Sequence, residues 1–491
     1  MSLQPLYRVD QARALDRRAI DELGIPGYTL MCRAGEAAAR WLLQRHPLAQ
    51  RVLIYAGPGN NGGDGYVMAR ALRRAGRQVQ VLVWPGDSGA SADARRARAD
   101  WLAAGGQCLP LDASAGPADV VVDALFGIGL TRALEGSAAA AVAAINAAGC
   151  PVLALDVPSG LNADTGHPTG PVVQASATMT FIVDKCGLHT GAAADFCGEI
   201  VVAGLDLPAQ FADDEPPAAE RLDRDLLARA LPPRRRTAHK GDFGHVLLIA
   251  GDDGYGGAAR LAAEAAARGG AGLTSLLTRP ANVQPVLSAR PEIMVRAAAA
   301  PAETDKPARP DVLVIGPGLG QRPWGRQWLD WALQQDHPLV LDADALNLLA
   351  AEPRQLPSGS VITPHPGEAG RLLGCSTAEI NADRYRAAAA LAERWDCVAV
   401  LKGAGSLIAA AGHTKRVCPY GNPGMASGGS GDVLAGLIGA LLAQGLPPFE
   451  AASVGALAHA LAGDAAAAEG QRGMLASDLL AQLRPTLNPS C

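Results

Sequence analysis

The stretch GNPGMASGGSGDVLAG, Gly421–Gly436, decides how the second half of this chain of 491 residues folds. It combines several glycines with one acid, Asp432, and leads into the apolar run Val433–Ala443, which is good helix-forming material. We expect residues 428–432 to form the loop that enters the first turn of this helix, where unpaired backbone N–H groups face outward. A helix start of this kind binds anions.

The carboxylate in this loop has two interpretations. Asp is a preferred helix N-cap, so Asp432 alone indicates a cap. A cap does not need the glycines at 428, 429 and 431, each of which costs backbone entropy unless a positive φ or a close ligand is required. The glycines therefore favour a bound phosphate, with Asp432 beside it as a base.

The bulk composition excludes several classes of protein. The length predicts two or three domains, of which two fit the pattern described below, and a net charge of −5 gives no basic footprint for nucleic acid. The 9 cysteines contain no C-x-x-C pair or zinc-ligand spacing, so we expect reduced thiols. Because the N-terminus carries charges and no run reaches the length of a membrane span, we expect a cytoplasmic protein without a membrane partner.

The first half alternates short β-branched runs with helical stretches. Continuous rather than alternating hydrophobicity predicts strands covered on both faces, hence a parallel sheet. The expected strands are Arg51–Ala56, Val79–Trp84, Asp119–Ala124, Val152–Leu155, Met179–Val183 and Ile200–Ala203. The stretch Pro208–Asp223, rich in Pro, Asp and Glu, breaks the pattern and is the expected linker. We set the domain limits at 1–213 and 222–491.

The alternation restarts after the linker. The expected strands are His245–Ala250, Leu273–Leu277, Val312–Ile315, Leu339–Leu341, Ser360–Thr363 and Val398–Leu401. Each is followed by Gly, Asp or Pro, and we expect a helical run after that. The fold class is therefore α/β with two doubly wound domains, in which ligands bind beyond the carboxyl ends of the strands.

A glycine-rich turn follows the first strand, in AGPGNNGGDGYVMARAL. The glycines at 57, 59 and 62 match the G-x-G-x-x-G pattern of dinucleotide binders. A dehydrogenase would then need an acid ending the second strand, and Asp87 is a candidate for it. That interpretation leaves unexplained the polar side chains within the turn, which are Asn60, Asn61 and Asp64.

Two further loops of the first half point to the same crevice. VVVDALFGIGLTR places Asp123 at a strand end, followed by a glycine-rich loop and Arg132, which is able to meet a phosphate. LALDVPSGLN places Asp156 and Ser159 likewise. Any one loop is ordinary turn chemistry, but the convergence of three predicts a ligand site.

The motifs GPGNNGGDG, DALFGIGLTR and DVPSGLN resemble the signature of the NAD(P)H-hydrate epimerase domain over roughly the whole first half. Asp156 is the residue that we expect to transfer the proton. The resemblance implies a Rossmann-like fold, and it implies a K⁺ ion held by Asn61, Asp123 and Ser159, whose hard oxygen ligands suit this ion. It also implies that the hydrated nucleotide binds Asn60, Asn61, Gly62, Gly63, Asp64, Gly127, Ile128, Gly129, Leu130, Thr131, Arg132 and Asp156.

The second half offers AGDDGYGGAARLAAEAAARGGAG, IGPGLG, LDADALNLL, TPHPGE and LKGAGS, each after an expected strand. A single His beside prolines, here His365, is more often structural than catalytic. Lys402 has the alternative of laying its alkyl chain on apolar surface while its charge stays in water. Together with HKGDFGHVLLIAG, these motifs and the opening stretch resemble the ADP/ATP-dependent NAD(P)H-hydrate dehydratases of the ribokinase-like fold. The motif more often has Thr where this chain has Ser430, which keeps the hydroxyl.

This second resemblance implies two sets of ligand contacts. The adenine nucleotide binds Lys402, Gly403, Ala404, Gly405, Ser406 and Gly431. The hydrated nicotinamide lies against Ala258, Gly318, His365 and Asp432. Asp432 would take the ring hydroxyl's proton while the loop N–H groups stabilise the transferring phosphoryl group, so that phosphate leaves instead of hydroxide.

The expected partners are small molecules: the hydrates of NADH and NADPH, with ADP or ATP carrying Mg²⁺. ADP is favoured by the precedent of fused bacterial proteins, and a homo-oligomer is expected. Three alternatives remain open: a small-molecule kinase, which would release a stable phosphorylated product; a non-enzymatic scaffold formed by the first half, which Asn61, Asp123, Asp156 and Ser159 disfavour; and the dehydrogenase.

Overall fold

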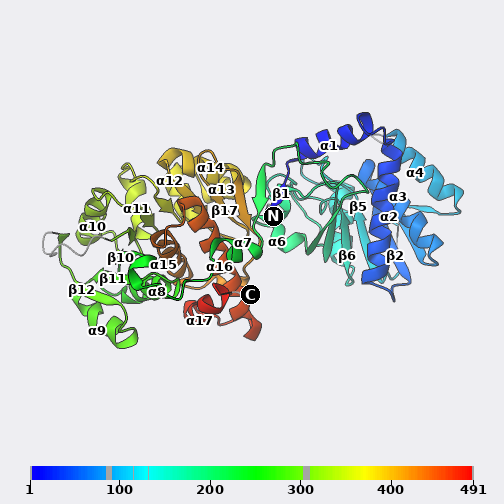
Figure 1. Cartoon of the computed structure of the whole chain (residues 1–491). Helices are drawn as coiled ribbons and strands as arrows, with labels where there is room; N and C mark the ends of the chain where they lie inside the picture. Colours follow the sequence, from blue (N-terminus) through cyan, green and yellow to red (C-terminus); the bar gives the residue numbers. More distant parts are fainter. Residues whose placement is uncertain (1–2, 85–90, 114–115, 131, 302–309, 489–491) are drawn as a thin grey trace. The chain divides into compact units, whose positions relative to one another are not determined.

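Two α/β units make up the chain in the computed structural model, which describes residues 3–84, 91–113, 116–130, 132–301 and 310–488 (Figure 1). The first unit spans Pro5–Ala219. The second begins at Glu220 and also includes Leu3 and Gln4, which the sequence-based domain limits assign to the first half. Two short strands, β1 (Gln4–Leu6) and β9 (Ala219–Arg221), contain the points where the chain passes between units.

The first unit contains a sheet of seven strands in the order β4-β3-β2-β5-β6-β7-β8, and every pairing is parallel. This order reverses direction between β2 and β5, the point at which doubly wound sheets bind ligands. The strands are β2 (Arg51–Ala56), β3 (Gln78–Val83), β4 (Cys108–Pro110), β5 (Val120–Ala124), β6 (Val152–Leu155), β7 (Ala177–Phe181) and β8 (Glu199–Ala203).

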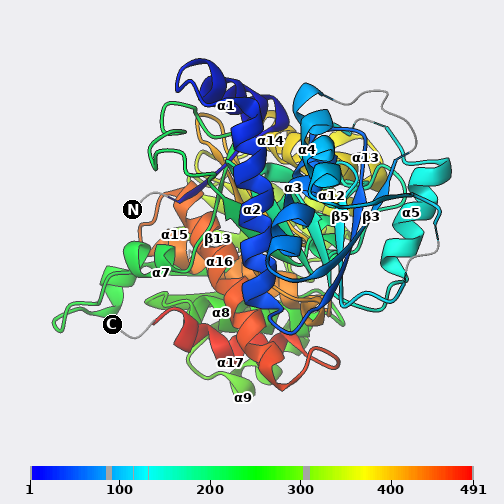
Figure 2. The same ribbon diagram turned by 90° about the vertical axis from the view of Figure 1, so that its right-hand side faces the viewer.

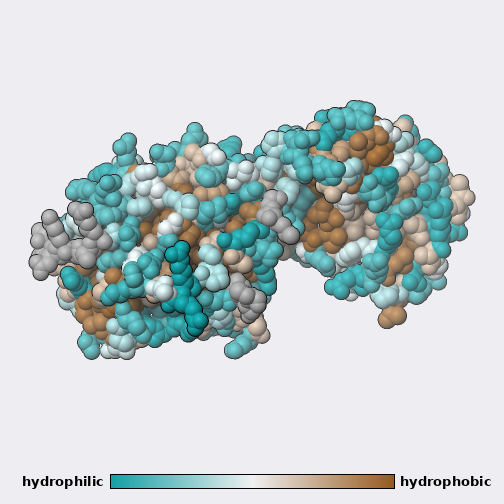
Figure 3. All heavy atoms as spheres, viewed as in Figure 1, coloured by the Kyte–Doolittle hydropathy of each residue, from teal (hydrophilic) through white to brown (hydrophobic). Residues whose placement is uncertain are grey.

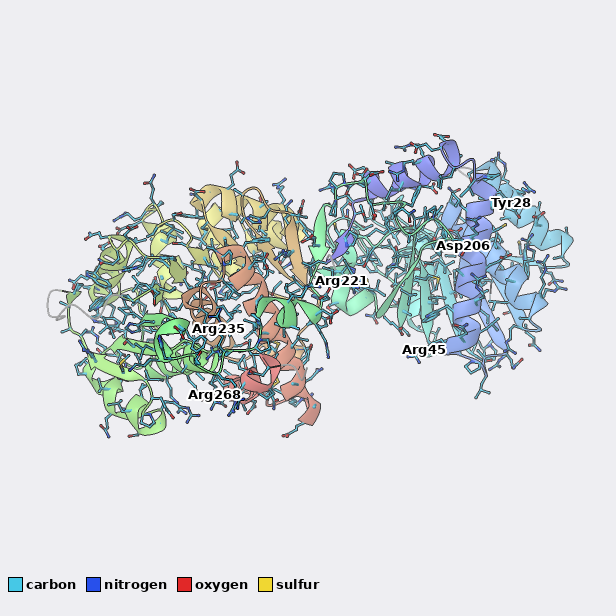
Figure 4. The ribbon with its side chains drawn as sticks, viewed as in Figure 1. Tyr28, Arg45, Asp206, Arg221, Arg235 and Arg268 are labelled. Atoms are coloured by element: carbon cyan, nitrogen blue, oxygen red, sulfur yellow. The ribbon has the colours of Figure 1, made fainter. Side chains whose placement is uncertain are left out.

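Helices cover both faces of this sheet because alternate strand residues point in opposite directions. Ile54 packs with α2, α3 and α4 on one face, while Leu53 and Tyr55 pack with α5 on the other (Figure 2). In Figure 4, Tyr28 and Arg45 mark the two ends of α2. The helices are α1 (Val9–Asp21), α2 (Gly27–Arg45), α3 (Asn60–Arg74), α4 (Ala92–Ala103), α5 (Gly136–Asn146) and α6 (Ala193–Phe196), with the 3-10 helix η1 (Cys186–His189).

The sheet of the second unit is also doubly wound, and its order reverses between β10 and β13. From β16 to β12 the order is β16-β15-β14-β13-β10-β11-β12, all parallel. The strands are β10 (His245–Ile249), β11 (Leu273–Thr278), β12 (Met294–Ala297), β13 (Val312–Ile315), β14 (Leu339–Leu341), β15 (Val361–Ile362) and β16 (Val398–Leu401).

The chain departs from the expected alternation after β16. The expectation of a helical run there is wrong: β17 (Ser406–Ala409) and β18 (Lys415–Cys418) follow instead, and each pairs antiparallel with its predecessor. The glycine loop 402–405 is therefore the tight connection of a hairpin rather than the start of a helix. Antiparallel neighbours need only such a short connection.

The apolar helix α15 lies against α8 and α16 at the core of the second unit. Leu3 is buried in the same core cluster, 7% exposed. The helices are α7 (Asp225–Ala230), α8 (Gly256–Arg268), α9 (Pro280–Ala289), α10 (Pro323–Leu333), α11 (Asp344–Ala351), α12 (Pro366–Leu373), α13 (Thr377–Ala382), α14 (Arg384–Trp395), α15 (Ser430–Ala443), α16 (Pro448–Ala466) and α17 (Ala476–Thr486), with 3-10 helices at Lys240–Phe243, Pro423–Met425 and Ala467–Glu469.

The surface drawn in Figure 3 is mostly hydrophilic, and its hydrophobic residues gather in separate areas. Across the ranges of the chain that the structure describes, none of the helices has the length and apolar character needed to cross a bilayer.

Candidate functional site

The first unit contains a cavity of about 610 Å³ at the carboxyl ends of β2, β5, β6 and β7. The predicted turn after β2 contributes to its wall, as do the loop after β5 and the residue that follows β6. Of the residues predicted from sequence, those that line it are Asn60, Asn61, Asp64, Gly127, Ile128, Gly129, Leu130 and Asp156. The structure therefore brings the three predicted loops to one site.

The other predicted residues of this half lie elsewhere. Gly62 and Gly63 are buried in the first turn of α3, and Arg132 is exposed. Thr131 lies outside the described residues, as does Asp87, on which the dehydrogenase alternative depends. The predicted strand, turn and helix around the glycines are confirmed, since β2 ends at Ala56 and α3 begins at Asn60.

Two fully buried groups, Asp123 and Ser159, are linked by hydrogen bonds. The Ser159 hydroxyl donates to Asp123 Oδ1 (2.7 Å), and the Ser159 backbone N–H donates to Asp123 Oδ2 (2.8 Å). Burial raises the pKa of Asp123 to about 6, although these hydrogen bonds act in the opposite direction. Asn61 is 8% exposed, and both polar atoms of its amide are buried without a hydrogen-bond partner among the residues that the structure describes.

Asp156 occupies a strained turn directly after β6. Its φ is +65°, and the N–H of Val157 donates to the carbonyl of Leu155 (2.8 Å), which closes a three-residue turn around it. Positive-φ turns of this kind are rare and concentrate at functional sites. The N–H of Ile128 donates to Asp156 Oδ2 (2.9 Å), an approach that requires Gly127, whose Cβ would lie 2.4 Å from that oxygen.

Sequence reasoning missed four charged groups of this cavity, which are Lys185, Asp16, Asp93 and Arg13. Lys185 Nζ lies 2.9 Å from Asp156 Oδ1, and its side chain is 2% exposed. Burial and the nearby Asp156 carboxylate raise the pKa of Asp16, and they hold that of Asp64 well above its ordinary value. Lys185 had a signal in the sequence, because it is the only lysine between positions 5 and 219; Asp16 had none.

In the second unit, Asp432 lies in the first turn of α15, as predicted, and Gly429 is the N-cap residue with φ +96°. Across the described part of the chain, the Asp432 carboxylate has no hydrogen-bond or ion-pair partner, so it does not cap the helix. Burial and the carboxylate of Asp342 raise its pKa to about 7, although Lys402 acts in the opposite direction. Asp432 is thus suited to proton transfer near neutral pH.

Lys402, directly after β16, forms an ion pair with Asp342 (Nζ to Oδ1, 2.6 Å) and lies 3.9 Å from Glu368 Oε2. Burial lowers the pKa of Lys402, but these two carboxylates outweigh it and raise the pKa above its ordinary value. Thr363 holds Asp342 with a further hydrogen bond (2.9 Å). A Cβ at Gly431 would lie 3.1 Å from Lys402 Nζ, so Lys402, Asp342 and the helix start converge.

The structure also describes other residues predicted for this half, which lie in the loop after Lys402 and at Gly318 and Ala258. In the loop after Lys402, Ala404 is exposed and the Ser406 hydroxyl donates to the carbonyl of Gly403 (2.9 Å). Gly318 packs close to Ala258, since its Cβ would lie 3.1 Å from the Ala258 Cβ.

His365 has the structural role that its position beside prolines suggested. Its Nδ1 accepts the N–H groups of Gly367 (3.0 Å) and Glu368 (3.3 Å), so that the imidazole is the N-cap of α12. Half of the side chain stays exposed.

Asp342, Glu368 and His459 were not predicted as site residues. Asp342 had a signal, because it directly follows a strand in LDADALNLL. His459 lies in the alanine-rich α16, where nothing in the sequence marks it. Its Nε2 lies 2.9 Å from the carbonyl oxygen of Ser430 and 3.2 Å from the hydroxyl, so it supports the first residue of α15. Burial lowers the pKa of His459 to about 4, which keeps it neutral.

Comparison with known proteins matches both units. Residues 27–187 match the family described as YjeF-related protein N-terminus, and residues 246–485 match that described as NAD(P)H-hydrate dehydratase. Proteins called bifunctional NAD(P)H-hydrate repair enzyme Nnr are 46% identical in Escherichia coli K12, over 99% of this chain and 94% of that protein, and 47% identical in Coxiella burnetii, over 99% of both.

Solved structures match the second unit. A ribokinase-like superfamily protein from Enterococcus faecalis has a TM-score of 0.51 at 32% identity, covering 55% of this chain and 96% of its own. The ADP/ATP-dependent NAD(P)H-hydrate dehydratase from Bacillus subtilis, co-crystallised with ATP and Mg²⁺, has a TM-score of 0.50 at 30% identity, covering 54% and 96%. The predicted Rossmann-like and ribokinase-like domains are thus confirmed, and the chain belongs to the family of bifunctional NAD(P)H-hydrate repair enzymes.

Proposed function

We propose that this chain restores hydrated NADH and NADPH in two steps: the domain 1–213 interconverts the two epimers of the hydrate, and the domain 222–491 dehydrates the S form with ADP. The observation that carries the second step is the Asp432 carboxylate, which lies in the first turn of α15 without capping it. A carboxylate at an anion-binding helix start is expected where it must meet a substrate proton beside a phosphate.

The dehydration follows from the chemistry of the leaving group. Asp432 takes the proton of the ring hydroxyl, whose oxygen attacks the terminal phosphoryl group of ADP and releases AMP. Phosphate, a far better leaving group than hydroxide, then departs, and the neighbouring ring carbon loses a proton to solvent as the ring double bond re-forms. The N–H groups that precede and open α15 stabilise the charge on the transferring phosphoryl group.

The nucleotide and the hydrate occupy neighbouring positions in this proposal. Lys402, Gly403, Ala404, Gly405, Ser406 and Gly431 bind the nucleotide, and Ala258, Gly318, His365 and Asp432 bind the hydrate. The convergence of Lys402 and Gly431 supports the phosphate position. Mg²⁺ is expected with the nucleotide, where it neutralises phosphate charge.

In the first domain, Asp156 is the proposed proton-transfer residue, and the hydrate occupies the cavity lined by Asn60, Asp64 and the loop 127–132. K⁺ is proposed between Asn61, Asp123 and Ser159. The amide of Asn61 supports this assignment: its buried carbonyl oxygen accepts no hydrogen bond within the described part of the chain and is therefore available to a cation. Carboxylate, amide and hydroxyl oxygens are the hard ligands that such an ion takes.

The cellular setting is proposed to be the cytoplasm, and the assembly a homo-oligomer. The cysteines of the described residues are all free, which suits a reducing compartment. The homo-oligomer stays a prediction.

The test uses a mixed-epimer NADH hydrate, with absorbance of reduced nicotinamide as the readout and ADP or ATP as the phosphoryl donor. Wild type should recover all of the NADH. Asp432→Ala should recover none, and Asp156→Ala should rapidly recover one epimer only. If wild type recovers no NADH with either nucleotide, the dehydratase proposal fails, and release of a stable phosphorylated product would identify a kinase instead.

A further inference from the structure

The cavity of the first unit is lined by four carboxyl side chains, one guanidinium group and one ammonium group. These charged residues are Asp16, Asp64, Asp93, Asp156, Arg13 and Lys185. Carboxylates that share a site disfavour each other's charge, and burial together with the nearby Asp156 carboxylate raises the pKa of Asp16 and of Asp64. Lys185 forms an ion pair with Asp156 and with none of the other three carboxyl groups within the described residues. The lysine therefore places its positive charge against one of the four, Asp156.

The ammonium group of Lys185 is completely satisfied. Its three protons go to Asp156 Oδ1 (2.9 Å), Thr180 Oγ1 (2.7 Å) and the carbonyl of Phe181 (2.8 Å). An ammonium group has three donors and no acceptor. No proton is left to give to a substrate, so Lys185 acts through Asp156 and not on the substrate itself.

The same strained turn of the backbone occurs twice around this ion pair, once after β6 and once after β7. Ile182, directly after β7, has φ +64°, and the N–H of Val183 donates to the carbonyl of Phe181 (2.8 Å), as in the turn around Asp156 after β6. Positive φ is a clear outlier for a β-branched residue. This second turn orients the chain so that Lys185, three residues later, reaches back to Asp156.

Both oxygens of Asp156 are thereby fixed from opposite sides. Lys185 holds Oδ1, the N–H of Ile128 holds Oδ2, and the carboxylate is 13% exposed. We propose that Lys185 is the positioning residue of the epimerase, which holds the Asp156 carboxylate in place and fixes its remaining lone pairs toward the bound hydrate. This inference rests on the proposed function of the first domain.

The test uses the full chain with a mixed-epimer NADH hydrate and ADP, so that recovery of NADH has two phases. The fast phase reports dehydration of the S form, and the second reports epimerisation. Lys185→Met, which keeps the length but loses the charge, should leave the fast phase unchanged. It should slow the second phase about 100-fold at saturating hydrate, within the usual contribution of an acid–base group, with a smaller change in KM.

Two variants separate positioning from simple structural support. Thr180→Val removes one acceptor of the ammonium group but keeps its charge, and the second phase should fall much less than in Lys185→Met. Lys185→Ala should regain the second phase with added propylamine, whose ammonium form replaces the missing group, but not with propanol. Thermal unfolding of each variant checks that the first unit is folded.

A second phase at the wild-type rate in Lys185→Met would overturn the inference, and so would loss of that phase in Lys185→Ala without rescue by the amine. A wild-type protein without an enzyme-dependent second phase, but with a normal fast phase, would instead overturn the proposed epimerase function.

Discussion

Asp432 lies in the first turn of α15, where the helix dipole stabilises negative charge. Burial and the Asp342 carboxylate nevertheless raise the pKa of Asp432 and so disfavour its ionised form. These two opposing effects suit a general base, because such a residue accepts a proton when it is ionised and must later release that proton to regain the ionised form. We expect Asp432→Asn to lower kcat of the dehydratase by about 10²–10⁴-fold, because the amide cannot take the hydroxyl proton. Nucleotide binding, measured by calorimetry, should persist; its loss would show that Asp432 acts in binding.

The pKa of about 7 for Asp432 predicts a pH profile. A general base works when ionised, so log kcat/KM should rise with pH below about 7 and level off above it. The rising limb should be absent from the residual activity of Asp432→Asn. A profile that is flat between pH 5 and 8 in wild type would contradict the assignment of Asp432 as the base.

The same shift has a consequence for stability. A carboxyl group with a raised pKa in the folded state stabilises the fold below its unfolded pKa, and this contribution is lost as pH rises through the folded pKa of about 7. At pH 8 the buried charge of Asp432 therefore opposes folding, and Asp432→Asn should unfold at a higher temperature than wild type. At pH 5 the two should unfold closer together.

At the scale of elements, the start of α15 is proposed to bind the nucleotide, whereas a later turn of the same helix packs against α8. Gly431 lies at the helix start beside Lys402, whereas Gly436 contacts α8, where its Cβ would lie 2.0 Å from the carbonyl oxygen of Ala262. We expect Gly431→Ala to raise KM for the nucleotide with a stability change within about 1 kcal/mol. Gly436→Ala should instead force the helices apart and cost about 1–3 kcal/mol. The contrast is checked by measuring KM for the nucleotide and the free energy of unfolding in urea for both variants. It is refuted if the two variants change both quantities equally.

The sequence was most informative about strands and their ends. The twelve runs chosen for continuous hydrophobicity all overlap strands. Most of these strands are buried on both faces, which leaves that signal in their own residues, whereas the edge strand β8 is apolar in sequence but only partly buried. The hairpin β17–β18 was missed, since its short strands follow a glycine loop like those that precede helices. Lys185 stood out as the only lysine between positions 5 and 219, but its role, like that of His459, comes from a partner far away in the chain. These partners are Asp156 and Ser430, and no local pattern encodes either pairing.

At the scale of the whole molecule, two units predict two thermal transitions. ADP with Mg²⁺ binds only the folded second unit in our proposal, so it should raise one transition, by about 2.7 kcal/mol at 100 times Kd. The other transition should stay in place. A variant lacking the charge of Lys402, such as Lys402→Met, serves as the control and should show a smaller shift. Equal shifts of both transitions would show that the units do not unfold independently.

Leu3 and Leu6 lie three residues apart but belong to different units. Leu3 is buried in the core cluster of the second unit, and Leu6, which is assigned to the first unit, is also fully buried. Leu3→Ala should therefore lower the transition that ADP shifts, by about 2 kcal/mol or more, and Leu6→Ala should lower the other. Calorimetry of the two variants with and without ADP tests this assignment, which fails if both act on the same transition.

The burial of Leu3 also bears on how the protein is made. During synthesis Leu3 leaves the ribosome long before Leu222 and the later residues of its core cluster. The first unit is able to fold on the nascent chain, whereas Leu3 has to wait, exposed, until the last strands and helices of the second unit emerge. A purification tag joined at the amino terminus is consequently attached to the dehydratase unit, although the epimerase unit follows it in sequence.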